Sequence, residues 1–194
     1  MEKILTSEKA LNLINSLPSA GKDDHWKAHS ICVGNAAAII AKALNLDCEK
    51  AKVLGYIHDI GKSENYKMHD VAGYDLIKKL GYEEEYAHIC LTHSYLNNDV
   101  DCVAGGHPPR NEFRDNFIKN HQYTIYEKII NLCDLMCKKE VMTVEKRMID
   151  LLMRKGVHDN TYYHIEETLK LKDEIENKLG FSVYDLFPTI KEHL

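Results

Sequence analysis

Apolar residues recur every three or four positions along almost the whole chain, the spacing that places them on one face of an α-helix. No run of alternating apolar and polar residues bounded by turn signals indicates a β-hairpin. The pattern therefore predicts an all-α fold. Thr6 and Ser7 are candidate caps for the first helix, and Pro18 ends it. The predicted helices cover about 7–17, 25–44, 48–61, 71–80, 83–95, 124–139, 143–155 and 161–179.

The segment 97–116 interrupts this helical pattern. It contains Gly105, Gly106, Pro108 and Pro109, and so it predicts a long loop. Loops of this length are uncommon in compact domains and often form lids or binding loops. No change in composition marks a linker, so we expect residues 1–194 to fold as a single domain.

Composition and charge narrow the range of partners. The chain has 194 residues, with 25 Lys and Arg against 30 Asp and Glu, a net charge of −5. Because no basic block is interleaved with aromatic residues, we expect no stable nucleic acid binding. The longest apolar stretch, Ala36 to Ala41, is too short for a membrane span, and the N-terminus lacks a signal-peptide core, which favours a cytoplasmic protein. The six cysteines form no CxxC pair, as expected for reduced thiols.

Several polar side chains occupy positions where the helical pattern places the core. His29, His58 and His93 each lie on the inward stripe of a different predicted helix, and Asp134 lies within the apolar run IINLCDLMC. Burial of an unpaired charge is costly, so each of these residues needs a partner. Each residue also has an explanation without a metal. A buried histidine is often only hydrogen-bonded, and Asp134 could form an ion pair with Lys138, which lies one turn further along the helix.

Taken together, these residues favour a shared metal site over separate explanations for each. His58 is followed directly by Asp59, which adds a second carboxylate to the set. Imidazole and carboxylate groups bind divalent transition metals, and helical bundles hold such ions between facing helices.

The same residues resemble the H…HD…D signature of the HD-domain phosphohydrolase superfamily, in its HDIG-type subgroup. His29 lies on an early helix, His58 and Asp59 lie in the string YIHDIGK, and Asp134 lies on a later helix. The resemblance covers about residues 25–140. It implies an HD-domain helical bundle with additional C-terminal helices, residues 143–194, packed on the same core.

Members of this superfamily bind one or two divalent metal ions. Dinuclear members carry two further histidines, which His69 in KMHDVAGYDLIKKLG and His93 in CLTHSY resemble. The HD-GYP subgroup has a tandem histidine and a Gly-Tyr-Pro element, whereas this chain has Ser94 after His93, so specificity for cyclic dinucleotides is not implied. The implied metal ligands are His29, His58, Asp59, His69, His93 and Asp134.

The chemistry implied by the resemblance is metal-dependent hydrolysis of a phosphate ester or anhydride. Iron or manganese suits imidazole with carboxylate best, while magnesium, nickel, cobalt and zinc stay open. The expected substrate is a small phosphorylated molecule, with a nucleotide as the first candidate. Asp59 is expected to bridge two ions and help orient the attacking hydroxide. Lys62, one turn past His58, is expected to meet the substrate phosphate as a second catalytic residue.

Four residues are candidates for substrate binding: Lys62, His88, His107 and Arg110. For each of them a solvated surface position is the alternative, and a lysine at a helix C-terminus is favoured there by the helix dipole. Five other histidines lie on no apolar stripe or motif, and we expect them at the surface: His25, His121, His158, His164 and His193.

Two other functions stay open at this stage. One is a di-iron HD-type oxygenase, since some HD-fold proteins oxidise C–H bonds at a six-ligand centre. The other is a non-enzymatic metal-binding signalling module, in which the metal stabilises the fold without turnover. The oligomeric state is equally open, with a homodimer as one candidate.

Overall fold

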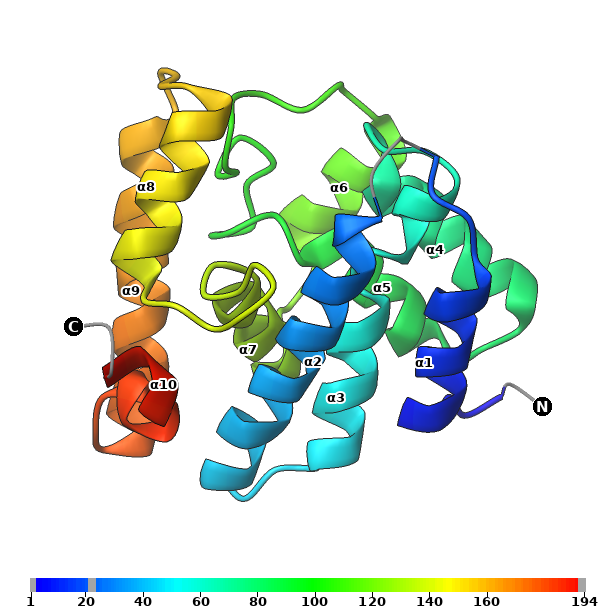
Figure 1. Ribbon diagram of the computed structural model, residues 1–194. Helices are drawn as coiled ribbons and strands as arrows, with labels where there is room; N and C mark the ends of the chain where they lie inside the picture. The colour runs from blue at the N-terminus through cyan, green and yellow to red at the C-terminus, as the bar shows by residue number, and fades with distance from the viewer. Residues whose placement is uncertain (1–2, 21–23, 192–194) are drawn as a thin grey trace.

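The computed structural model describes residues 3–20 and 24–191 of the chain, and every regular element in these ranges is helical (Figure 1). Two isolated bridges, Lys3 with Tyr82 and Cys137 with Val141, are the only β-type pairings described there. The predicted all-α fold is confirmed. In chain order the elements are α1 (Ser7–Ser16), α2 (His25–Ala43), α3 (Cys48–Ile57), η1 (Ile60–Ser63), α4 (His69–Leu80), α5 (Glu84–Thr92), α6 (Glu112–Asn120), α7 (Ile125–Asp134), α8 (Val144–Lys155), α9 (Thr161–Leu179), η2 (Val183–Leu186) and α10 (Pro188–Lys191).

The helix ends follow the capping chemistry of the sequence. Thr6 accepts a hydrogen bond from the backbone N–H of Lys9, which caps α1 as predicted. Thr124 and Glu127 form a reciprocal capping box at the start of α7. Gly81 ends α4 in the left-handed conformation, with φ at 74°. Local sequence therefore fixes where several site-bearing helices begin and end.

The helix predicted over 83–95 ends at Thr92, and two other predicted helices are also too long. The helix expected to reach Gly61 ends at Ile57 and gives way to the 3₁₀ helix η1, and the helix expected over 124–139 ends at Asp134. In both places an apolar stripe continues past the end of the helix, so the periodicity alone gives no stop signal. Both breaks fall at residues of the predicted metal site, where the backbone turns to present its side chains.

The predicted loop 97–116 is wrong over its last five residues, because α6 begins at Glu112. Asn111 caps this helix by accepting a hydrogen bond from the backbone N–H of Arg114. The short elements η2 and α10 were not predicted either. These helices are short, and they take their stability from tertiary contacts, which periodicity does not record.

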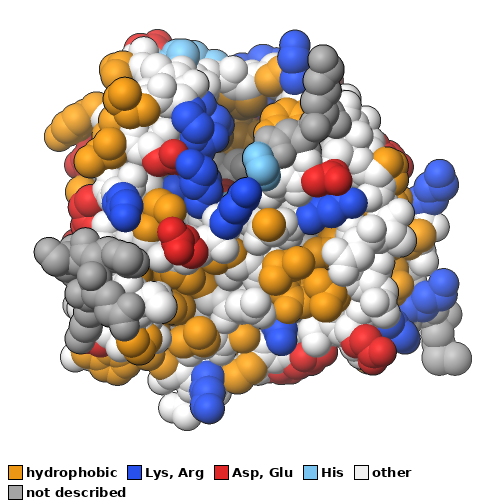
Figure 2. Space-filling model, in the orientation of Figure 1, with side chains coloured by type: hydrophobic (Ala, Val, Ile, Leu, Met, Phe, Trp, Pro, Cys, Tyr) orange, Lys and Arg blue, Asp and Glu red, His pale blue; other side chains and the backbone are white. Residues whose placement is uncertain are grey.

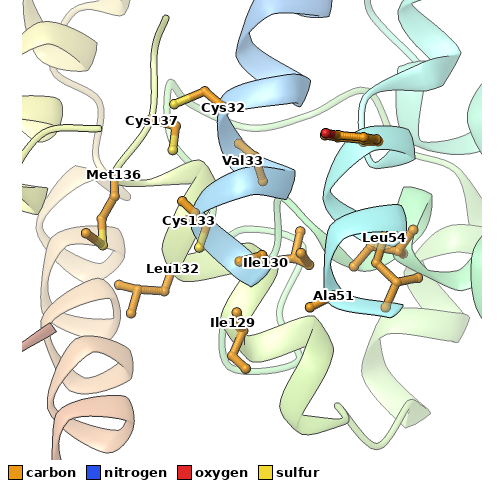
Figure 3. Close-up of a cluster of buried hydrophobic side chains, with 14 of the residues drawn as sticks. Cys32, Val33, Ala51, Leu54, Ile129, Ile130, Leu132, Cys133, Met136 and Cys137 are labelled. Carbon is orange, nitrogen blue, oxygen red and sulfur yellow. The ribbon is translucent and has the colours of Figure 1, made fainter. Parts of the chain in front are cut away.

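The core is shared by the early helices and the C-terminal ones. α2 packs against α3 and α7, and α7 in turn contacts α9. Figure 3 shows Cys32 and Val33 of α2 facing Ile130 and Cys133 of α7, with Leu54 of α3 on the far side. Leu171, Ile175 and Val183 belong to the same buried cluster. The C-terminal helices are thus packed on the core that carries the predicted site.

The structure also bears on the predictions for the cysteines and for membrane spans. All six cysteines are free, and five of them are buried. Within the two described ranges, no helix combines the length and the apolar content that a bilayer-spanning segment needs.

Candidate metal centre

The break between α3 and η1 places His58 and Asp59 in the interior. His58 follows the last residue of α3 and keeps a helical backbone, while Asp59 turns away from it with φ at −99° and ψ at 9°. Both residues are buried, with exposed fractions of 0% and 1%. Gly61 allows η1 to approach α4 closely, because a Cβ at this position would overlap the backbone of His69 and Gly73.

The Asp59 carboxylate lies between two pairs of histidines. Its Oδ1 is 3.4 Å from Nε2 of His69 and 3.4 Å from Nε2 of His93. Its Oδ2 is 3.6 Å from Nε2 of His58 and 3.8 Å from Nε2 of His29. Each oxygen thus faces its own pair of imidazoles, so two groups of potential metal ligands share one carboxylate.

Asp134 joins the centre through His29. Its Oδ1 lies 2.8 Å from His29 Nε2, although the two residues come from α7 and α2. The alternative partner at sequence level, Lys138, instead contacts Asp150 at 2.9 Å. The carboxylate that interrupts the apolar stripe of α7 therefore points to the histidine cluster, and the intrahelical ion pair is not formed.

Backbone carbonyls fix the orientation of three of the four imidazoles. Nδ1 lies 2.7 Å from Gly55 O in His58, 2.9 Å from Cys90 O in His93 and 3.2 Å from Tyr66 O in His69. An Nδ1–H that donates to a carbonyl leaves Nε2 as the lone-pair nitrogen, the arrangement typical of metal-bound histidine. The Nε2 atoms accordingly point inward, with the pair His29 and His58 3.3 Å apart and the pair His69 and His93 3.1 Å apart.

The electrostatics of the centre favour the neutral form of His58 and His69 and the ionised form of both acids. Burial lowers the pKa of His58 to about 3 and that of His69 to about 4. Burial also opposes a charge on His93, but Asp59 outweighs it and raises the pKa of His93. Burial would raise the pKa of Asp59 and Asp134, yet Lys62 and the histidines lower that of Asp59 and the hydrogen bond from His29 lowers that of Asp134.

Lys62 contacts the carboxylate at the middle of the centre. Its Nζ donates to Asp59 Oδ2, and its side chain is 17% exposed. Burial disfavours the ammonium ion, but Asp59 dominates and raises the pKa of Lys62. Lys62 is therefore charged at the edge of the histidine cluster, on the side that solvent reaches.

The donor set fits divalent metal ions. Pairs of inward Nε2 lone pairs only 3.1 and 3.3 Å apart repel each other unless a proton or a cation lies between them. Two carboxylates and one ammonium group also leave a net negative charge when the imidazoles are neutral. Neutral imidazole and carboxylate are the ligands that first-row transition metals prefer. The cluster could therefore hold a metal ion in either of its two groups.

The other predicted substrate-binding residues have different contacts in the described part of the chain. His88 packs its ring 4.8 Å from Phe117 in an aromatic cluster. His107 lies between Asp101 and Asp159, at 2.8 and 2.9 Å. Arg110 pairs with Asp101 at 2.8 Å. None of these three contacts the histidine cluster, whereas Lys62 does.

The sequence analysis missed a buried ion pair next to the centre. Asp70 directly follows His69, and its Oδ2 accepts hydrogen bonds from Arg114 Nη1 at 3.0 Å and from Tyr95 Oη at 2.6 Å. Asp70 and Arg114 are 2% and 1% exposed. Arg114 was missed because α6 was predicted as loop. The one signal in the sequence was the position of Asp70, an acidic residue directly after the candidate ligand His69.

One surface assignment is also wrong. His164 is 3% exposed, because the stripe Thr161, His164, Thr168, Leu171, Ile175 faces inward along α9. This helical spacing was present in the sequence and would have found it. His25 and His158 are exposed as expected, His121 is half-buried, and His193 lies outside the described residues.

Comparisons with known proteins bear on these residues. The family model described as HD domain matches residues 27–138, more than half of the chain. Ribonuclease Y from Oleidesulfovibrio alaskensis is 28% identical over 167 residues, which cover 79% of this chain and 31% of that protein. Ribonuclease Y from Lawsonia intracellularis is 30% identical over 110 residues, or 49% of this chain and 21% of that protein.

An archaeal protein matches over nearly its full length. MJ0778 from Methanocaldococcus jannaschii is 28% identical over 177 residues, covering 89% of this chain and 98% of its own. The chain thus spans less than a third of the ribonuclease Y proteins but almost all of this relative. No solved structure matches. With its H…HD…D residues gathered in one buried cluster, the chain belongs to the HD-domain family, which is typically one of metal-dependent hydrolases.

Proposed function

We propose that this protein is a metal-dependent phosphohydrolase that cleaves a phosphate ester or anhydride of a small phosphorylated molecule, with a nucleotide as the first candidate. The observation that carries the proposal is the shared carboxylate. Asp59 faces one histidine pair with each oxygen, and Asp134 closes one of the two groups. Two divalent ions in such groups can stabilise the attacking and departing oxygens of an in-line displacement.

The residues divide into two ligand groups. His29, His58, Asp59 and Asp134 would hold one ion, and Asp59, His69 and His93 the other. Ions bound there would supply Lewis acidity toward a phosphoryl oxygen and lower the pKa of coordinated water. Imidazole-rich ligation favours iron or manganese over magnesium, which prefers all-oxygen sites.

The protein's own side chains would position and stabilise the reacting group. Asp59, held by Lys62 and by the histidines around it, provides a fixed negative charge that orients a nucleophile between the two groups. Lys62, partly open to solvent, places an ammonium ion where a substrate phosphate would approach. His88, His107 and Arg110 have other partners, and their part in substrate binding stays a prediction.

A second candidate substrate is RNA. The relatives named ribonuclease Y favour it, since their name describes cleavage of RNA and one of them is similar to 79% of this chain. We give it second place because the net charge of −5 disfavours a long polyanion.

The test is hydrolysis by protein reconstituted with Mn²⁺ or Fe²⁺. We expect phosphate release from a panel of nucleotides and from p-nitrophenyl phosphate, and a loss of at least about a hundredfold in His58→Ala and Asp59→Ala. His158→Ala, which removes an exposed histidine outside the cluster, is the matched control. Equal activity in the wild type and the two site variants would refute the proposal.

The same preparations separate the alternatives. Cleavage of a short oligoribonucleotide in preference to every nucleotide would assign the site to RNA. Oxygen consumption by the iron-loaded protein, without phosphatase activity for any metal, would assign it to the oxygenase class. A rise in melting temperature with metal and no turnover would leave a binding module.

A further inference from the structure

The second ligand group of the metal centre, Asp59 with His69 and His93, depends on two helix ends that stay together. His69 is the first residue of α4, and His93 directly follows the last residue of α5. Their Nε2 atoms lie 3.1 Å apart, so both can reach one ion only while the two helix ends keep this spacing. Ligand distances in metal sites are held within about 0.2 Å, and a small shift of either end therefore matters.

A buried hydrogen-bonded triangle joins the same two helix ends. Asp70 directly follows His69, and Tyr95 lies two residues beyond His93. Tyr95 Oη donates to Asp70 Oδ2 at 2.6 Å, and Arg114 Nη1 donates to both of these oxygens, at 3.0 Å each. The guanidinium also lies over the Tyr95 ring, 5.2 Å from its centroid. One arginine of α6 therefore bridges the two segments that carry the histidines.

Arg114 is fixed from its other side as well. Its Nη2 donates to Pro109 O at 2.8 Å and to Asp115 Oδ1 at 2.7 Å, and its Nε donates to Asp115 Oδ1 at 2.9 Å. With the two hydrogen bonds of Nη1, all five N–H groups of the guanidinium have an acceptor. A planar group that is held at every donor has one orientation, so α6 presents it to Asp70 and Tyr95 as a rigid bridge.

The burial of this charged group needs an explanation. Figure 2 shows Lys and Arg side chains at the surface of one face, where water solvates them, whereas Arg114 and Asp70 are 1% and 2% exposed. Replacement of a buried ion pair by apolar residues of similar volume often leaves a fold equally stable or more stable, so stability alone does not explain this pair. What a buried ion pair adds is a fixed geometry between the segments that carry it.

The other ligand group has no such support. His29, His58 and Asp134 belong to α2, to the end of α3 and to α7. Within the two described ranges, none of them hydrogen-bonds to Arg114 or to its partners in the triangle. The arginine bridge therefore bears on one of the two ion positions.

We propose that Arg114, with Asp70 and Tyr95, is a positioning unit for the second ion, which holds the ends of α4 and α5 at the spacing where His69 and His93 share that ion. The proposal rests on the proposed function and deepens it, because it names residues that decide whether the centre holds one ion or two. The three side chains act through the histidines and do not bind the ion themselves. Loss of a residue that orients metal ligands typically weakens metal binding by about ten- to a hundredfold.

Calorimetric titration of the metal-free protein with Mn²⁺ tests the proposal without turnover. The binding step that is missing in the double variant His69→Ala, His93→Ala is assigned to the second ion. In Arg114→Met we expect the affinity of this step to fall about ten- to a hundredfold, and the affinity of the other step to stay within about twofold. Tyr95→Phe keeps the ion pair, and with it the fold, and should weaken the second step about tenfold.

Arg147→Met is the matched control, because it also removes a buried arginine, one that pairs with Asp150 on α8 at 2.7 Å. It should leave both binding steps unchanged. A purely structural role is separated by adding Asp70→Asn to Arg114→Met, which should restore part of the unfolding free energy. The second step should stay weak in this double variant, because no guanidinium joins the two helix ends. Recovery of the second step together with stability would overturn the positioning role.

The outcomes are independent of hydrolysis. A selective loss of the second step in both Arg114→Met and Tyr95→Phe would support the positioning unit even if none of the tested nucleotides is cleaved. An unchanged second step in either variant, an equal loss in both steps, or a wild type that binds only one ion would overturn it even if phosphate is released.

Discussion

Gly61→Ala is the substitution that tests the architecture of the centre most sharply. A methyl group on Gly61 would lie 2.8 Å from the carbonyl carbon of His69, with the carbonyl oxygen of His69 and the nitrogen of Gly73 closer still. These atoms belong to the backbone of α4, so no side-chain rotation relieves the overlap. Ordinary contact at about 3.5 Å requires η1 and α4 to separate by on the order of 1 Å.

This separation has two consequences. Overpacking against a backbone should reduce the free energy of unfolding by about 3 kcal/mol, the upper part of the range for such substitutions. Ligand distances in metal sites are held within about 0.2 Å, so a movement five times larger should abolish binding by the group of Asp59, His69 and His93. The group around His29 and Asp134 is carried by α2, α3 and α7, and we expect it to keep its ion.

Urea denaturation and the metal content of purified protein measure the two effects. Gly81→Ala is the matched control, because nothing lies within 4 Å of an added Cβ there and only the left-handed backbone, with φ at 74°, disfavours alanine. It should cost about 1 kcal/mol and leave metal binding intact. A Gly61→Ala protein with the stability of Gly81→Ala and the metal content of the wild type would refute this reasoning.

Two further predictions concern buried polar residues outside the ligand set. Arg114→Met should lower the free energy of unfolding by about 3–5 kcal/mol, because it leaves the Asp70 carboxylate buried without its cation. In urea denaturation, adding Asp70→Asn to Arg114→Met should restore part of the lost unfolding free energy. If the double variant is no more stable than Arg114→Met, the Asp70–Arg114 pairing is contradicted. Because burial lowers the pKa of His164 to about 4, the unfolded chain binds the extra proton below about pH 6.5. The free energy of unfolding of the wild type should therefore fall by about 1–3 kcal/mol between pH 6.5 and pH 4. The fall should be smaller in His164→Gln, and in the control His158→Gln it should equal that of the wild type.

Apolar periodicity predicted the helices that carry the candidate site, and polar residues that interrupt this pattern pointed to the candidate ligands. His29, His58, His93 and Asp134 stood out because each interrupts an apolar stripe, and in the structure all four face one another across helices. Such an interruption is visible in one dimension, since burial of an unpaired charge needs an explanation wherever it occurs. The resemblance to the HD family added His69. This residue is the first of α4 and interrupts no apolar stripe, so periodicity alone does not point to it.

The rest of the site depends on tertiary contacts that the sequence does not display. Arg114 is a charged residue in a short polar helix, and only its approach to Asp70 explains its burial. The end of α3 at Ile57 is another example, since the close packing of Gly61 on α4 overrides an apolar pattern that runs on.

The metal content of the reconstituted protein tests the central claim most directly. Elemental analysis after loading with Mn²⁺ or Fe²⁺ and removal of free metal should give two ions per chain for the wild type. The double variant His69→Ala, His93→Ala should retain one ion, and Asp59→Ala should retain none, with the helical circular dichroism spectrum preserved in each. A wild type that binds no ion, or a double variant that still binds two, would contradict the account.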